Sequence, residues 1–144
     1  MAISLDSQPQ PARSQYEGAC ESSDGDGRAV REVLDRIGDK WSLLVIVTLN
    51  EGLLRFTELR RHIPGISQRM LTLTLRQLER DGLVARTVHA EVPPRVEYEL
   101  TDVGRTLIEP SMALAGWAIE NYPRITAARD RFDASANQAG QSRR

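Results

Sequence analysis

The sequence predicts one mainly helical domain with a small β-hairpin, an α+β fold. Its 144 residues are enough for a single domain with a hydrophobic core. Apolar residues recur at three- and four-residue spacing through most of the middle of the chain, and alternation is confined to a short stretch before residue 101. Glycine or proline punctuates these segments, so we expect short elements joined by tight turns.

Two tails are expected to flank a folded unit of residues 28–129. Residues 1–27 hold five carboxylates against the single basic residue Arg13 before residue 28, and have almost no large apolar side chains. Such a segment cannot bury enough surface to offset the entropy lost on ordering. Residues 130–144 have the same character, so both segments are predicted to be flexible.

Three helices are predicted in the first half of the folded unit. The first has apolar residues at helical spacing over 30–37 and stops at Gly38. The second, residues 41–49 after the potential cap Asp39, is apolar nearly all round and so belongs in the core, with a buried strand as the alternative because of its β-branched residues. The third runs from residue 56 to 63 and is stopped by a proline and a glycine.

Ser67 opens the next predicted helix, which ends before Gly82. This helix has a leucine-rich stripe on one side and polar residues on the other. Two β-prone runs follow at 83–89 and 95–100, with a proline-containing hairpin tip between them. Thr101 is the expected N-cap of a final helix over 101–122, which Pro110 should kink or divide.

This order of elements is that of a winged helix-turn-helix with terminal dimerisation helices. Residues 62–66 form a connection short enough to present the following helix, residues 67–81, to a major groove of DNA. Between Arg55 and Arg80, six arginines stand against two glutamates, a balance of +4 in a chain whose total is −1. A basic stretch at the proposed reading element favours binding to double-stranded DNA.

Arginine, glutamine and hydroxyl side chains are residue types that read base edges or hold phosphates. The candidate DNA-binding residues combine the polar face of the reading helix, the preceding helix and the hairpin, which would be the wing of residues 83–100. They are Ser67, Gln68, Arg69, Thr72, Arg76, Arg60, Arg61, Pro94 and Arg95.

Other function classes are disfavoured by what the sequence lacks. No nucleophile–base–acid order, glycine-rich phosphate loop or pair of carboxylates can be picked out, so we expect neither an enzyme nor a cofactor. One cysteine and two histidines are too few for a structural zinc site or a disulfide framework. No apolar run reaches the length of a membrane helix, so a cytoplasmic protein without membrane contact is expected.

Several dense motifs resemble one known family. They are GDKW at 38–41, RFTELRRHIPGISQRMLT at 55–72, DGLV at 81–84 and EVPPRVEYELTDVG at 91–104. In this order, over about residues 30–121, they resemble the HxlR-type transcriptional regulators, winged-helix proteins allied to the MarR group. The resemblance implies a homodimer that binds operator DNA, with the helix after PGIS as the reader and PPRVEY in the wing.

The terminal helices would form the dimer interface. A single small domain has little core left for the apolar residues of the last helix, although burial within the protomer is the alternative for Trp117 and Tyr122. The candidate interface residues come from the first and last helices. They are Val30, Val33, Leu34, Leu114, Trp117, Ala118, Ile119 and Tyr122.

The chain departs from the pattern of this family at one position. Many relatives carry a cysteine thirteen residues before the tryptophan of GDKW, and in some of them it senses oxidants; here that position is Arg28. Cys20 lies eight residues upstream among acidic residues, which disfavour the reactive thiolate. We therefore do not expect Cys20 to be a redox sensor.

Two other interpretations bear on the same residues. A winged-helix module that binds only proteins would replace Arg69, Arg76 and Arg95 with neutral or acidic residues, and all three are present. A small-molecule effector would add to DNA binding without replacing it, and the sequence neither names such a ligand nor excludes one.

Overall fold

The computed structural model describes residues 25–143. The chain divides into two compact units between Lys40 and Trp41. The helix α1 (Gly25–Ile37) belongs to the first unit, and the winged-helix elements belong to the second. Because α1 starts at Gly25, the predicted tail of residues 1–27 overlaps it by three residues. The rest of that tail, Cys20 included, lies outside the described residues.

Helix α1 ends where the sequence predicts. The amide of Gly38 donates to the carbonyl of Leu34 over 2.6 Å, which closes the last turn. One helical turn is braced by an ion pair of 2.9 Å between Arg28 and Glu32, and this contact raises the pKa of the Arg28 guanidinium. The side chains of Val33 and Leu34 are exposed.

Helix α2 (Lys40–Thr48) continues into a single 3₁₀ turn, η1 (Leu49–Glu51). The alternative of a buried strand is therefore wrong. Gly52 follows with a φ of 128°, a backbone conformation that glycine adopts without strain. Val45 and Ile46 are completely buried, so α2 lies in the core as its composition predicts.

The helix-turn-helix consists of α3 (Phe56–His62) and α4 (Gln68–Arg80). The turn between them contains Gly65 with a φ of 87°. The hydroxyl of Ser67 accepts a hydrogen bond of 3.0 Å from the amide of Met70, which confirms the predicted N-cap of the second helix.

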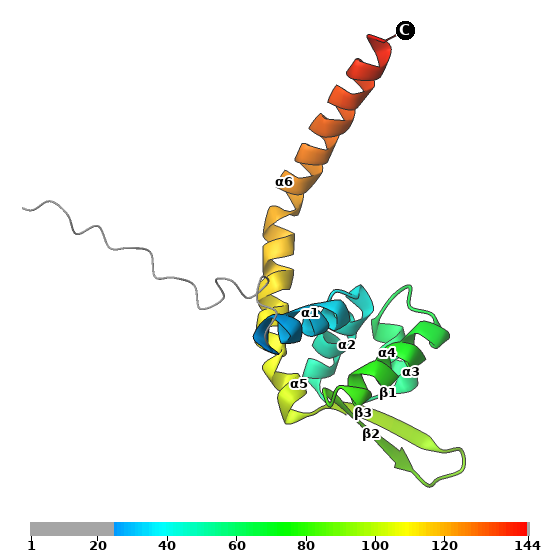
Figure 1. Cartoon of the computed structure of the whole chain (residues 1–144). Coiled ribbons are helices and arrows are strands. Elements are labelled where there is room, and N and C mark those ends of the chain that lie inside the picture. Colours follow the sequence, from blue (N-terminus) through cyan, green and yellow to red (C-terminus); the bar gives the residue numbers. More distant parts are fainter. Residues whose placement is uncertain (1–24, 144) are drawn as a thin grey trace, which may run out of the picture. The chain divides into compact units, whose positions relative to one another are not determined.

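The predicted hairpin is part of a three-stranded antiparallel sheet. Its strands β2 (Val84–His89) and β3 (Arg95–Leu100) match the predicted bounds to within a residue. A third strand, β1 (Leu54–Arg55), was not predicted; it pairs with the other edge of β3 and gives the order β1-β3-β2. Figure 1 shows β2 and β3 extending together as the wing.

One apolar core holds α2, α3, α4 and the sheet together. Leu71, Leu75 and Leu78 of α4 are buried, as the predicted leucine stripe requires. The other members of the core come from α2, η1, α3, the turn before α4, and the strands β2 and β3. They are Val45, Ile46, Leu49, Leu59, Ile63, Ile66, Val84, Tyr98 and Leu100, with Trp41 and Phe56 packed against them.

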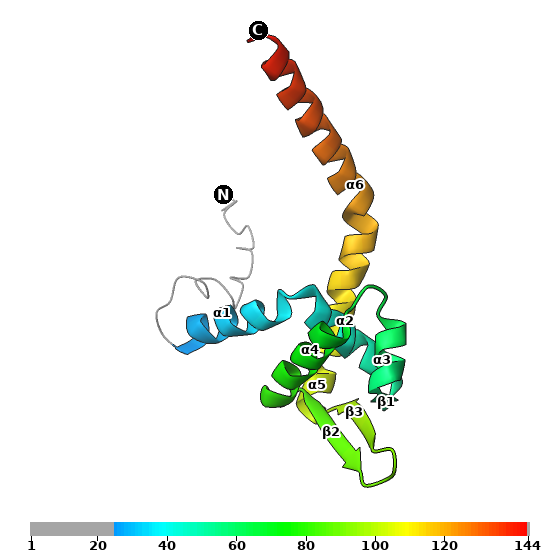
Figure 2. The same ribbon diagram turned by 90° about the vertical axis from the view of Figure 1, so that its right-hand side faces the viewer.

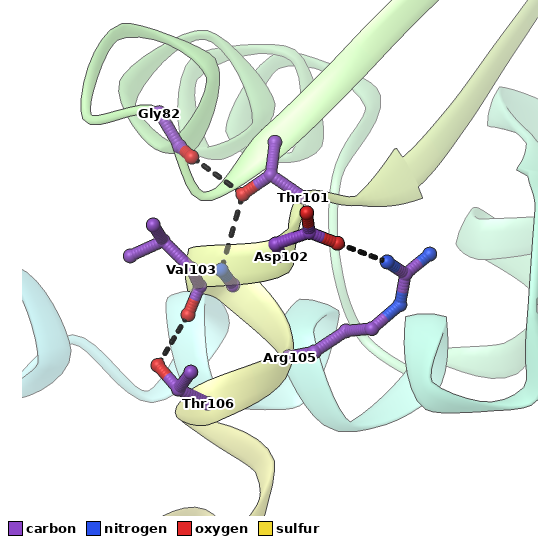
Figure 3. A network of polar contacts seen from close by, with 7 residues as sticks. Gly82, Thr101, Asp102, Val103, Arg105 and Thr106 are labelled. Atoms are coloured by element: carbon purple, nitrogen blue, oxygen red, sulfur yellow. Dashed lines mark hydrogen bonds and ion pairs between the residues drawn. The ribbon is translucent and has the colours of Figure 1, made fainter.

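A hydrogen-bonded junction fixes the wing to the helices on either side of it (Figure 3). The Thr101 hydroxyl donates to the carbonyl of Gly82 over 2.6 Å and accepts from the amide of Gly104 over 3.1 Å. The Thr101 amide also donates to the carbonyl of Leu83 over 3.1 Å. Thr101 is thus the predicted N-cap of α5 (Asp102–Thr106) and also ties the end of β3 to the turn after α4.

Pro110 divides the last predicted helix in two, as expected. Its nitrogen cannot donate to the carbonyl of Thr106, where α5 ends. It lies instead in the first turn of α6 (Ile108–Gln141), where a backbone donor has no helical partner.

The segment predicted as a flexible tail, residues 130–144, is helical up to Gln141. Helix α6 continues through this segment, and the whole helix from Ile108 to Gln141 is about 51 Å long. Residues 130–141 include three alanines, two glutamines and one arginine, which favour helix, and adding residues to an existing helix avoids the cost of nucleation. Within the second unit, no other helix or strand lies beside the C-terminal half of α6 in either view (Figures 1 and 2).

None of the described helices combines the length and the apolar character of a membrane span. Despite its length, α6 carries seven charged residues between Glu109 and Asp133.

Candidate nucleic-acid interface

The outward face of α4 is the first part of the candidate site. Residues 69, 72, 73 and 76 have the spacing of one helical face. Together with Gln68 they line an open depression on the surface. Arg69 and Arg76 are exposed, and neither makes an ion pair among those the described residues show, whereas the Thr72 hydroxyl donates to the carbonyl of Gln68 over 2.9 Å.

Leu73 is a member of this face that the sequence analysis missed. Its side chain is 48% exposed, although leucine in an amphipathic helix is usually buried. It follows Arg69 by four residues, and this spacing could have placed both residues on the same face of the helix. An exposed apolar side chain between two arginines can contact the methyl group of thymine.

Arg86 was also missed. This residue of β2 lies directly opposite Tyr98 of β3. With Arg76 and Thr72 of α4, and with Glu79, it lines a second hollow between the helix and the sheet. The wing therefore adds a cation beside the outward face of α4. Only the packing of α4 on β2 could show this, because the two arginines are ten residues apart and on different elements.

The two arginines of α3 occupy its last turn. Arg60 and Arg61 are both exposed, and cations at this end complement the helix dipole. Both guanidinium groups are thus accessible from solvent.

The wing tip places Pro94 and Arg95 differently from each other. Pro94 is exposed and lines a third hollow with Arg55 and Phe56 at the start of α3. Arg95 is only 31% exposed in its side chain, and its Nε lies 2.9 Å from a carboxylate oxygen of Glu97. This candidate DNA-binding residue of the wing is therefore paired with an acidic residue.

The predicted dimer residues share one property. All except the half-buried Val30 are exposed in the protomer, so the alternative that Trp117 and Tyr122 are buried within it is wrong. Trp117 is 55% exposed and Ile119 is 78% exposed. Such an apolar surface on one long helix is typical of an interface with another chain.

No group of three or more metal-ligating side chains occurs among residues 25–143. What these residues do bring together is a helix-turn-helix, an adjoining wing and a row of exposed arginines. These features define a winged-helix transcriptional regulator.

The chain belongs to the HxlR-like helix-turn-helix family, whose model matches residues 36–126. It is 49% identical over 107 residues to an HTH-type transcriptional regulator of Methanothermobacter thermautotrophicus, covering 74% of this chain and 82% of the relative. Both the family and this relative are regulators of transcription. The expectation that the protein is not an enzyme is therefore confirmed.

Solved structures agree with this assignment. The putative transcriptional regulator ytfH from Salmonella typhimurium is 40% identical and superposes with a TM-score of 0.65, over 70% of this chain and 90% of that one. The redox regulator HypR in its reduced form is 44% identical with a TM-score of 0.64, over 69% and 98% of the two chains. The winged-helix fold predicted from the sequence is thereby confirmed.

Proposed function

We propose that this regulator binds a specific duplex DNA through the outward face of α4, with the wing beside it. The observation that carries the proposal is the pair of exposed arginines, Arg69 and Arg76, on the second helix of a helix-turn-helix. In this architecture the second helix enters the major groove, where arginine binds guanine through two hydrogen bonds. The exposed arginines of α3 would hold the flanking phosphates.

A homodimer is part of this proposal. The exposed apolar residues of α6 and of α1 would form its interface, and a two-fold dimer would recognise a palindrome with half-sites about 34 Å apart or a multiple of that distance. A small-molecule effector and a cytoplasmic location stay predictions.

Selection of bound duplexes from a random pool tests the proposal. We expect a palindromic consensus, and an affinity for the selected duplex that falls steeply with salt, because each phosphate contact contributes about −0.9 to the slope of log K against log salt. Failure to enrich any duplex at low salt would refute DNA binding. A shallow slope would contradict the arginine-rich interface.

Replacing one interface residue should separate the protomers. Trp117→Glu places a charge in the predicted apolar interface, so we expect sedimentation at micromolar concentration to show a dimer for the parent and a monomer for this variant. Val92→Glu at the fully exposed wing tip is the control and should leave the dimer intact. A monomeric parent that still binds a single half-site would overturn the dimer.

Oxidation should not be the main switch of this protein. HypR is described as a redox regulator, but the position at which many relatives carry a cysteine, which senses oxidants in some of them, is Arg28 here, and its guanidinium pairs with Glu32. We therefore expect diamide to change the DNA affinity of the parent and of Cys20→Ser by less than about tenfold. If diamide releases only the parent, Cys20 is the sensor.

A further inference from the structure

A cluster of ionisable residues on the wing includes Arg95, one of the candidate DNA-binding residues. Glu97 of β3 lies between two nitrogen-bearing side chains, with one carboxylate oxygen 2.9 Å from Nε of Arg95 and the other 3.2 Å from Nε2 of His89. The Glu97 side chain is only 15% exposed. Neither nitrogen has a hydrogen-bond partner of good geometry among the described residues, so the two contacts are close approaches to the carboxylate rather than directed hydrogen bonds.

The strand register explains why these residues meet. His89 and Arg95 are directly opposite each other on β2 and β3, and Glu97 is two residues further along, so it projects from the same face of the sheet. Arg55 of β1 lies opposite Glu97 on the other side. The remaining charged groups around His89 are Glu91, which is 3.5 Å from Arg95, and Glu99, which shares the face of β3.

We propose that Glu97 is a positioning residue that couples the protonation of His89 to the release of Arg95 toward DNA. The inference rests on the proposed DNA binding and specifies how that binding is regulated. When His89 is neutral, Glu97 keeps Arg95 as its counter-ion and the wing is held back from phosphate. When His89 is protonated, it replaces Arg95 as the counter-ion, and the guanidinium is free to pair with a backbone phosphate.

The physical reason is the cost of leaving a mostly buried carboxylate without a counter-charge. A phosphate that takes Arg95 from Glu97 incurs this cost unless another cation is at hand. His89 is already within ion-pair distance, and histidine is the side chain that gains its charge between pH 8 and pH 5. DNA binding therefore takes up a proton, and by reciprocity lower pH strengthens DNA binding.

The pH dependence of affinity for the selected duplex tests this inference. At constant ionic strength, we expect the parent to bind the selected duplex at least about fivefold more tightly at pH 5.5 than at pH 8.0. His89→Gln should lose this dependence. His62→Gln is the matched control, because His62 is the other histidine of the chain and its Nδ1 donates a hydrogen bond to the carbonyl oxygen of Glu58 on α3. This control should keep the dependence of the parent.

Glu97→Gln separates coupling through the carboxylate from a direct contact between His89 and phosphate. The glutamine keeps the shape of the side chain but does not need a counter-ion. Under the proposal, this variant binds at pH 8.0 at least as tightly as the parent and loses most of the pH dependence. A direct contact predicts instead that Glu97→Gln keeps the pH dependence of the parent, and that result would overturn the inference.

Two other outcomes are informative. A parent that binds the duplex equally at all pH values refutes the coupling and leaves the proposed function intact. A parent that binds no duplex at any pH refutes both. Far-ultraviolet circular dichroism of each variant at both pH values establishes that a change in affinity does not arise from unfolding.

Discussion

Gly104→Ala is expected to lower the free energy of unfolding by about 3 kcal/mol, at the upper end of the usual cost of overpacking. Gly104 is buried at the start of α5. A Cβ atom there would overlap the carbonyl oxygen of Leu83 and would lie 3.3 Å from Cδ2 of Leu100. The backbone of Leu83 cannot move away freely, because its carbonyl accepts the hydrogen bond from Thr101.

Thermal unfolding at equal protein concentrations measures this loss, since association would otherwise shift the midpoint. A loss of this size should lower Tm by about 10 °C. Gly116→Ala is the matched control: it lies within α6, no atom approaches its Cβ position within 4 Å, and alanine favours helix. This control should be neutral or slightly stabilising. Equal Tm values for the two variants would contradict the packing described for the junction.

Arg69→Ala and Arg76→Ala are expected to weaken binding to the selected duplex by roughly 1 to 3 kcal/mol each. Both side chains lie on the outward face of α4, where they would read base edges. The loss should be much smaller on a scrambled duplex, because a scrambled sequence offers no matched base contact. Arg60→Ala should instead weaken binding to both duplexes alike, since a phosphate contact carries no sequence information.

Fluorescence anisotropy with the two duplexes at one salt concentration gives these values. Arg105→Ala serves as the control, because this exposed arginine of α5 pairs with Asp102 at 3.0 Å and is not part of the candidate site. It should bind both duplexes like the parent. If Arg69→Ala loses equal affinity for the selected and the scrambled duplex, α4 does not read the sequence through this residue.

The sequence alone determined most of the helices and the order of the elements. The segments with apolar residues at helical spacing are bounded by residues that start or stop helices. The predicted caps at Ser67 and Thr101 both form in the structure. These features depend on contacts within three or four residues along the chain, so a local pattern contains them. The polar face of α4 could be predicted for the same reason.

The end of helix α6 could have been predicted from helix propensity, which the prediction of a flexible tail did not consider. The tail expected from residue 130 was inferred from the scarcity of apolar side chains, which bears on burial. Helix propensity and propagation from a formed helix act without burial, and the segment to Gln141 is helical while its side chains remain exposed.

Only the tertiary structure decided which residues from separate elements meet. The two residues of β1 are too few for any period, and they form a strand because β3 offers a free edge. The position of Arg86 beside Arg76 depends on how α4 packs on β2. The contact of Glu97 with His89 and Arg95 depends on the strand register, which the hairpin as a whole sets and no local pattern reveals.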